Sequence, residues 1–338
     1  MADETARRAV TRCSAARLGA HAMTVRTGAT LLAILAVTGC ATIGKVLASI
    51  PTSPDPLSSG YRIVMPGEVA EATPAQMIER LARADVVFFG EQHNDPETHR
   101  AEAELLDAIG QMGRPVVLSL EMFERDVQGV MDDYLAGQLS ERELLARSRP
   151  WDRYATDYRR LIELAKEHHW RVVAANVPRP LASAIGCKGL AALDTLTPRD
   201  RSYVARENVC PRDDYRARFM ESMRSHSAGS GPAQTADSLP TATAERFYLA
   251  QCVKDETMAE SIVNARLAAP REAIVVHFDG AFHSDYSQGT VARVKRREPG
   301  WTLAVVSALP VADPAVASIV TQSGKADFVI FTRRAARL

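Results

Sequence analysis

The feature that most constrains the fold is a series of short, continuous apolar runs, each followed by residues with helical spacing. One run covers residues 86–89 and ends at Gly90, and another covers residues 116–120 directly after Pro115. Runs of this length are typical of strands buried on both faces, as in a parallel sheet. Similar runs occupy 172–175, 274–278, 303–306 and 328–331, and helical stretches lie near 97–112, 124–148, 155–169, 198–224, 244–268 and 287–297. This alternation predicts an α/β fold with an open, mostly parallel sheet flanked by helices.

The order of segments predicts a leader, a tether and one large domain. We expect a signal peptide over residues 1–39, a lipidated tether over 40–72 rich in Pro and Ser, and an α/β domain over 73–338. The interval 122–170 holds more helix than one crossover needs, which predicts a small helical cap over the edge of the sheet. Residues 225–243 are rich in Ser, Ala, Gly, Thr and Pro, a composition typical of a flexible surface insertion.

The N-terminal segment carries the signature of an exported lipoprotein. An apolar run over residues 29–37 follows Arg26, and it is too short to span a bilayer but suits a signal-peptide core. The run ends in Val-Thr-Gly before Cys40, which predicts lipidation of Cys40, whereas an ordinary secretory signal or a short anchor helix is the alternative. A basic segment precedes Met23, so Met23 is a second candidate start. Ala41, in place of an acid, favours the outer membrane if the cell is Gram-negative.

Composition narrows the class of partner. The chain is 46% hydrophobic and 24% charged, as expected of a globular protein, and its 41 basic and 41 acidic residues leave no net charge. A neutral chain gives no reason to expect a nucleic-acid partner. Cys187, Cys210 and Cys252 show no CxxC spacing, so a zinc knuckle is unsupported. Either Cys187 pairs with Cys210 across a short loop, or all three remain free and buried.

Polar side chains that can do chemistry follow the ends of the predicted strands. Glu91 and His93 follow the first strand, Glu121 follows the second and His283 follows the fourth. Because the carboxyl ends of parallel strands share one edge of a sheet, we expect these four side chains to converge in a crevice. Glu121 is the strongest of them, since a carboxylate directly after an apolar strand must be paired or face a polar crevice. The alternative is that Glu91 or Asp95 caps the following helix, which begins near Pro96.

Other histidines fit structural roles better. His277 lies inside an apolar strand and is interpreted as a core histidine, and His99 is expected on the exposed first turn of a helix.

Two kinds of site suit such a cluster. Glu91, His93, Glu121 and His283 provide the ligands of a hydrolytic metal site with an open position for water, or, without a metal, a general base and its partners. A haem site needs an apolar pocket and an axial ligand instead, and iron accepts His, Met, Cys or Tyr. The predicted cap provides tyrosines beside cations that can pair with propionates. The candidate haem contacts are Tyr154, Tyr158, Arg153, Arg179, His93 and His283.

Six segments in one order resemble a known family, the ChaN-type haem-binding lipoproteins. They are FFGEQHNDPETHR, VVLSLEMFERDVQ, WDRYATDY, VVAANVPRPLA, AQCVKDETMAESI and DGAFHSDYSQGT, and the resemblance extends over residues 80–310. The family belongs to the wider Tiki/TraB/erythromycin-esterase group, which shares a GExH-type turn after the first strand, an acid after the second and a later GxxH. Glu91, His93, Glu121 and His283 occupy those positions here. The segment at 225–243 departs from the pattern, because it is longer than that connection requires.

The resemblance implies an iron-uptake lipoprotein that binds haem, with a homodimer holding haems between subunits as one arrangement. The wider group implies the alternative, a hydrolase of the protease or esterase type that uses Glu91, His93, Glu121 and His283 with or without a divalent metal. A third hypothesis is a surface interaction protein in which this cluster has no chemical role. Haem binding at the membrane is therefore the expected function, and the anchor at Cys40 fits it.

Overall fold

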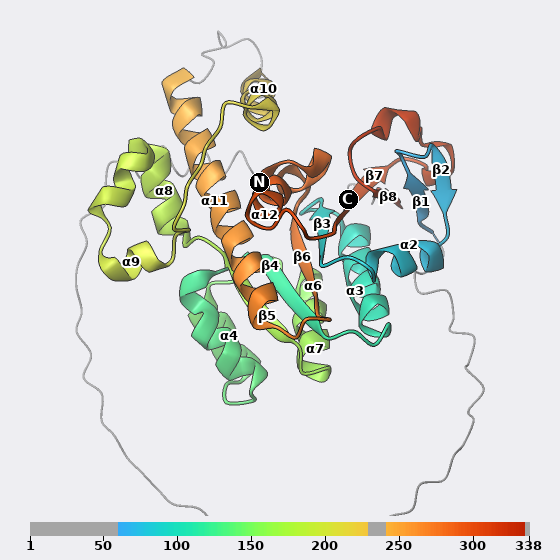
Figure 1. The fold of residues 1–338 in the computed structure, drawn as a ribbon, viewed down its shortest axis with the longest axis horizontal. Helices are drawn as coiled ribbons and strands as arrows, with labels where there is room; N and C mark the ends of the chain where they lie inside the picture. The colour runs from blue at the N-terminus through green and yellow to red at the C-terminus, as the bar shows by residue number, and fades with distance from the viewer. Residues whose placement is uncertain (1–59, 229–240, 335–338) are drawn as a thin grey trace, which may run out of the picture.

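A computed structural model describes residues 60–228 and 241–334 of the chain. All six predicted strands form, and they lie parallel to one another in a single open sheet (Figure 1). They are β3 (Val86–Glu91), β4 (Val116–Glu124), β5 (Arg171–Asn176), β6 (Ile274–Gly280), β7 (Leu303–Val311) and β8 (Phe328–Arg333). The sheet order is β2 (Ala70–Ala72), β1 (Arg62–Met65), β8, β7, β3, β6, β4 and β5. The predicted α/β class, with an open and mostly parallel sheet, is confirmed.

Two short strands that the sequence analysis missed extend one edge of the sheet. β1 (Arg62–Met65) pairs antiparallel with β8, and β2 (Ala70–Ala72) pairs antiparallel with β1. The predicted tether over residues 40–72 is therefore too long, because its last part is a hairpin in the sheet. Ile63 and Val64 are buried there, and these apolar residues were overlooked among the prolines. Cys40 and the predicted signal peptide lie outside the described residues.

Helices cover both faces of the sheet. On one face lie α2 (Pro74–Leu81), α3 (Pro96–Gly110), α4 (Gln128–Leu135), α5 (Glu141–Ser148), α6 (Tyr154–Asp157) and α7 (Arg159–Glu167), which share one apolar core with alternate strand residues such as Phe89 and Leu118. On the other lie α11 (Thr241–Ala268) and α12 (Gly289–Arg297), packed against Phe88 and Val117. The period-two alternation of a strand explains why Phe88 and Phe89 belong to different cores.

The helices between β4 and β5 occupy the interval where a cap was predicted. Their side chains Met131, Leu144 and Leu161 belong to the same apolar core as strand β4, so they pack directly on the sheet. The insertion predicted over 225–243 lies largely outside the described residues. Helix α10 (Asp214–Ala228) ends within its first part, and α11 begins within its last part.

A third group of helices packs on the outside of α11. α8 (Arg179–Lys188) follows β5 and shares a small apolar core with α11, and α9 (Pro198–Ser202) follows α8. Cys210, in the segment before α10, forms a disulfide with Cys252 of α11. The suggested pairing of Cys187 with Cys210 is therefore wrong, because Cys252 is the residue that α11 brings to Cys210. No helix among the described residues combines the length and the apolar character that a membrane crossing requires.

Candidate functional site

The carboxyl ends of three neighbouring strands bring the predicted residues together. Glu91 at the end of β3 is in register with Gly280 at the end of β6, and the Glu121 carboxylate of β4 accepts a hydrogen bond from the Gly280 N–H at 2.8 Å. A Cβ atom on Gly280 would lie 2.7 Å from His93 Nε2 and 3.7 Å from Glu121 Oε2. His93 therefore lies directly over Gly280 and close to Glu121, as the strand topology predicted.

His283 is held between two carboxylates. Its Nδ1 lies 2.7 Å from Asp255 Oδ1 and its Nε2 lies 3.3 Å from Glu121 Oε1. Burial lowers the pKa of His283, but Glu121 and Asp255 outweigh it and raise that pKa to about 10, so the ring is a cation at neutral pH. Burial raises the pKa of Glu121, and the charge of His283 outweighs it, leaving that pKa far below its ordinary value. We call Glu121, Asp255 and His283 the His283 network.

Asp255 was not singled out from the sequence, yet it anchors this network. It lies inside α11 and is fully buried, and it also accepts hydrogen bonds from the Tyr215 hydroxyl at 2.7 Å and the Thr290 hydroxyl at 3.0 Å. The carboxylate is therefore surrounded by two hydroxyl donors and the charged ring of His283. No sequence signal set Asp255 apart, because it lies between Lys254 and Glu256 in a polar stretch of the helix.

His93 and Glu91 form a second pair on the same edge. Nδ1 of His93 lies 2.5 Å from Glu91 Oε1, which also accepts a hydrogen bond from the Tyr158 hydroxyl at 2.8 Å. The His93 side chain is 34% exposed, and the edge of its ring packs on Trp151 with 5.0 Å between ring centroids. Burial lowers the pKa of His93, but the hydrogen bond and charge of Glu91 outweigh it and raise that pKa. His93 is thus the accessible member of the predicted cluster.

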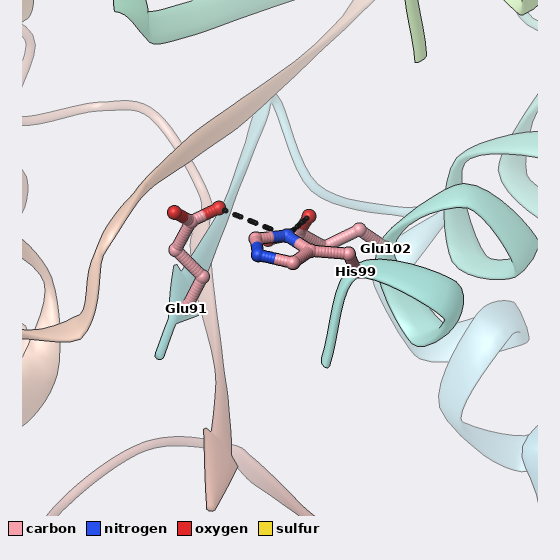
Figure 2. Close-up of side chains that lie close together, drawn as sticks. All are labelled: Glu91, His99 and Glu102. Atoms are coloured by element: carbon pink, nitrogen blue, oxygen red, sulfur yellow. Dashed lines mark hydrogen bonds and ion pairs between the residues drawn. The ribbon is translucent and has the colours of Figure 1, made fainter. Parts of the chain in front are cut away.

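Directly beneath this pair lies a buried group that the sequence analysis missed. Glu91 also faces His99 and Glu102 on helix α3, and Figure 2 shows these two side chains directed toward the Glu91 carboxylate. His99 Nδ1 lies 2.9 Å from Glu102 Oε2 and 3.7 Å from Glu91 Oε2. We call Glu91, His99 and Glu102 the buried triad. Burial, followed by the Glu91 carboxylate, raises the pKa of Glu102 well above its ordinary value.

The expectation that His99 sits on an exposed helical turn is wrong. His99 and Glu102 lie on the buried face of α3 together with Leu106 and Ile109. The positions 99, 102, 106 and 109 have the three-and-four spacing of one helical face, which was the sequence signal for their burial. His277 is a core histidine as predicted. It is fully buried, its Nδ1 lies 2.9 Å from the Ser119 hydroxyl, and burial lowers its pKa to about 3.

The predicted metal set does not form a ligand cluster in this arrangement. Within 60–228 and 241–334, the one group of three or more His, Cys, Asp or Glu whose ligand atoms all lie within 4.8 Å of one another is the buried triad. Glu91 belongs to it, but His93, Glu121 and His283 do not. The reason is that both ring nitrogens of His283 already face carboxylates, Asp255 on one side and Glu121 on the other.

The predicted haem contacts differ in how accessible they are. Tyr154 and Tyr158 are both buried: Tyr154 packs on Phe123, and the Tyr158 hydroxyl donates to Glu91. Burial raises the pKa of each phenol, so neither is ready to act as a phenolate ligand. Arg153 pairs with Asp157 at 2.6 Å, and the largely exposed Arg179 lies 3.6 Å from Glu124. His283 is buried, which leaves His93 and the two arginines within reach of a ligand.

Tyr286 is an exposed tyrosine that the sequence analysis did not select. It follows His283 on the loop after β6, is 44% exposed, and adopts φ 64° and ψ 21°. This left-handed conformation is rare for a bulky residue and marks a constrained position. Arg218 and Lys325 lie over its ring, 5.0 and 5.6 Å from the centroid, and its backbone N–H donates to the Lys325 carbonyl at 2.7 Å.

Comparisons with known proteins agree with this fold. The family model described as "Haem-binding uptake, Tiki superfamily, ChaN" matches residues 77–294, more than half of the 338 residues. No curated protein matches the chain. Among solved structures, one that describes cofacial haem binding to ChaN of Campylobacter jejuni aligns with a TM-score of 0.61 and 16% identity, covering 81% of this chain and 98% of that one.

A structure of a mutant of the erythromycin esterase EreC, in its open conformation, aligns with a TM-score of 0.42 and 12% identity, covering 82% of this chain and 84% of that one. At this level the esterase carries no argument, and the Campylobacter structure shows the fold alone. The family assignment rests on the match over residues 77–294, and the resemblance found in the sequence is confirmed. The chain belongs to the ChaN family of haem-binding uptake proteins in the Tiki superfamily.

Proposed function

We propose that this protein binds haem at the cell envelope, as part of iron uptake or haem handling. The observation that carries the proposal is the family match over residues 77–294. The exposed edge of the sheet supports it, because His93 and Trp151 there offer a ring nitrogen and an apolar surface beside one another. Haem iron accepts both histidine and tyrosine as axial ligands.

The residues present fit haem at the rim of the site better than in its interior. Tyr154 and Tyr158 would have to leave a packed core to reach an iron, whereas Tyr286 already presents its ring to solvent. The cations Arg218 and Lys325 beside Tyr286 can pair with propionates. We therefore place the axial ligand on Tyr286 or His93 and the propionates near these cations, with Arg153 and Arg179 as further partners.

Hemin titration of the purified chain tests this proposal. We expect a saturable Soret shift, with an affinity reduced about tenfold or more in Tyr286→Phe or His93→Gln. Tyr154→Phe is the matched control, since it removes a phenol that is buried, and it should bind hemin as the wild type does. If Tyr154→Phe or Tyr158→Phe loses the Soret shift while Tyr286→Phe keeps it, the axial ligand is one of the two buried tyrosines. The absence of saturable binding in the wild type would reject haem binding itself.

The predicted lipid anchor is part of the same proposal. Cys40 lies outside the described residues, so the support is the sequence Val-Thr-Gly-Cys at the end of an apolar run. Two or three acyl chains hold a protein at a membrane where one does not. Labelled palmitate should enter the wild-type chain and fail to enter Cys40→Ser. Recovery of the wild type in the inner-membrane fraction would contradict an outer-membrane location.

The same edge supports a second candidate function, hydrolysis of a peptide or an ester. The observation that favours it is the juxtaposition of a histidine–carboxylate pair, His93 and Glu91, with the charged ring of His283. Such a pair can take a proton from water, and a fixed cation can stabilise developing negative charge. Ester or peptide cleavage lost in His93→Gln, a variant of a partly exposed residue, would support it. Equal background rates in wild type and variant would reject it.

A further inference from the structure

We propose that the buried triad of Glu91, His99 and Glu102 binds one divalent transition-metal ion beneath the sheet edge. The three side chains come from strand β3 and helix α3, and each is almost completely buried. One ligand atom of each lies within 4.8 Å of the other two (Figure 2). An ion bound about 2.0–2.2 Å from each ligand holds ligand atoms roughly 3–4 Å apart, so only small side-chain movements are needed.

The strongest sign of a missing partner is a pair of unpaired oxygens. Glu91 Oε2 and Glu102 Oε1 are buried and have no hydrogen-bond partner among the described residues. The other oxygen of each carboxylate is already engaged, Glu91 Oε1 by the Tyr158 hydroxyl and Glu102 Oε2 by the ring of His99. A buried carboxylate oxygen without a partner is strongly unfavourable. Either a cation or a proton shared between the two glutamates has to satisfy them.

The surroundings of His99 favour the cation. Its Nε2 lies 3.3 Å from the His93 carbonyl oxygen, which can accept a hydrogen bond from it, and 3.3 Å from the charged Asp157 Oδ2, so the surroundings favour a proton on that nitrogen. With the proton on Nε2, the lone pair of Nδ1 would bind the ion in place of its 2.9 Å contact with Glu102 Oε2. Metal-bound histidines characteristically donate their other ring N–H to a carboxylate or a backbone carbonyl in this way. Arg153 holds Asp157 in place, and the Tyr158 ring packs on the His99 ring with 5.1 Å between centroids.

The donor set identifies the class of ion. Two carboxylates and one imidazole suit zinc, manganese or ferrous iron, whereas calcium takes six to eight oxygen ligands. A dication also compensates the negative charge that Glu91, Glu102 and Asp157 concentrate in the interior. Bound there, the ion ties helix α3 to the end of strand β3 directly below His93. This inference does not depend on haem binding, because no residue of the triad is needed as a haem ligand.

The test begins with the untagged full chain, stripped with EDTA and titrated with zinc or manganese chloride. We expect one equivalent of metal and a higher melting temperature in the loaded protein. Glu102→Gln, which keeps the size of the side chain, should weaken binding by about 100-fold or more. Glu97→Gln is the matched control, because Glu97 lies on the same helix but is an exposed partner of Arg100, and it should bind as the wild type does.

A second measurement does not depend on any variant folding. X-ray absorption of the zinc-loaded wild type should show only nitrogen and oxygen donors. Sulfur donors, or full binding in Glu102→Gln, would place the metal elsewhere and overturn the proposal. A wild type that takes up no metal, and has the same melting temperature with and without EDTA, would show that the two glutamates share a proton instead. Hemin titration of the EDTA-stripped chain separates these outcomes from the proposed function.

Discussion

The His283 network and the buried triad are built from the same residue types, two acids around one histidine, but they differ in how their charges are satisfied. In the His283 network, Asp255 and Glu121 accept hydrogen bonds from Tyr215, Thr290 and the Gly280 N–H as well as facing the charged ring. In the buried triad, one oxygen of each glutamate has no partner among the described residues. The carboxylates of the His283 network are therefore satisfied by the groups around them, whereas the unpaired oxygens of the buried triad indicate a missing ligand.

The largest expected effect comes from breaking the complete network. Asp255→Asn keeps the size of the side chain but removes one of the two charges around His283. The free energy of unfolding should fall by about 3 kcal/mol or more, because a buried charge loses its partner. Denaturant unfolding with the exposed pair Arg333–Asp313 as reference measures this, and Asp313→Asn should cost less than about 1 kcal/mol. Equal losses of unfolding free energy in Asp255→Asn and Asp313→Asn would mean that the buried ion pair contributes no more to stability than the exposed one.

The contributions of His277 and His283 to stability should change with pH in opposite directions. The pKa of His277 is lowered to about 3, below its unfolded value of 6.5, so its contribution to stability is present above pH 6.5 and is lost as the pH falls toward 3. Between pH 7 and pH 4 the wild type should lose on the order of 3 kcal/mol more than His277→Gln, which stays neutral. Parallel curves for the two proteins would show that His277 is not the group that titrates.

His283 should govern the alkaline side instead. Its pKa is raised to about 10, so its contribution is fully present below pH 6.5 and is lost as the pH rises through about 10. Unfolding curves from pH 6.5 to pH 10 should therefore decline in the wild type. The decline should be smaller in Asp255→Asn, since removing that carboxylate lowers the pKa of His283. A steeper loss of stability with rising pH in Asp255→Asn than in the wild type would show that Asp255 does not raise the pKa of His283.

The fold and the edge site were predictable from the sequence for one physical reason. Continuous apolar runs specify buried parallel strands, and parallel strands bring Glu91, Glu121 and His283 to one edge whatever the length of the chain between them. Residues at the end of a strand are therefore easier to place than residues on a helix. His99 was misplaced because a polar residue near a helix start was assumed to be exposed, although its spacing with Leu106 and Ile109 matched the buried face.

The remaining errors concern partners that sequence order does not reveal. Asp255 meets His283 because α11 packs against the sheet near the end of β6, and Cys252 meets Cys210 because the segment before α10 lies against α11. The orientation of Tyr154 and Tyr158 into the core was equally hidden, since tyrosines near a site are compatible with either direction. The proposed haem contacts at the rim depend on side-chain exposure, which strand and helix patterns do not determine.

The smallest expected effect is a difference in stability between the variants Gly90→Ala and Gly280→Ala. A Cβ atom on Gly90 would lie 2.8 Å from the Ala281 Cα atom, whereas one on Gly280 would meet the ring of His93 at 2.7 Å. Backbone cannot move aside, so Gly90→Ala should cost about 1–3 kcal/mol of stability. The His93 ring is partly exposed and can swing outward, so Gly280→Ala should cost less than about 1 kcal/mol.

Gly280→Ala should nevertheless change the pKa of His93 at the candidate functional site. Moving His93 away from Glu91 removes the hydrogen bond that raises the pKa of His93, so that pKa should fall in a proton NMR titration. The affinity for hemin should change with it if His93 contacts the haem, whereas Gly90→Ala should act mainly on stability. An unchanged pKa of His93 in Gly280→Ala would show that the ring does not lie over this glycine in solution.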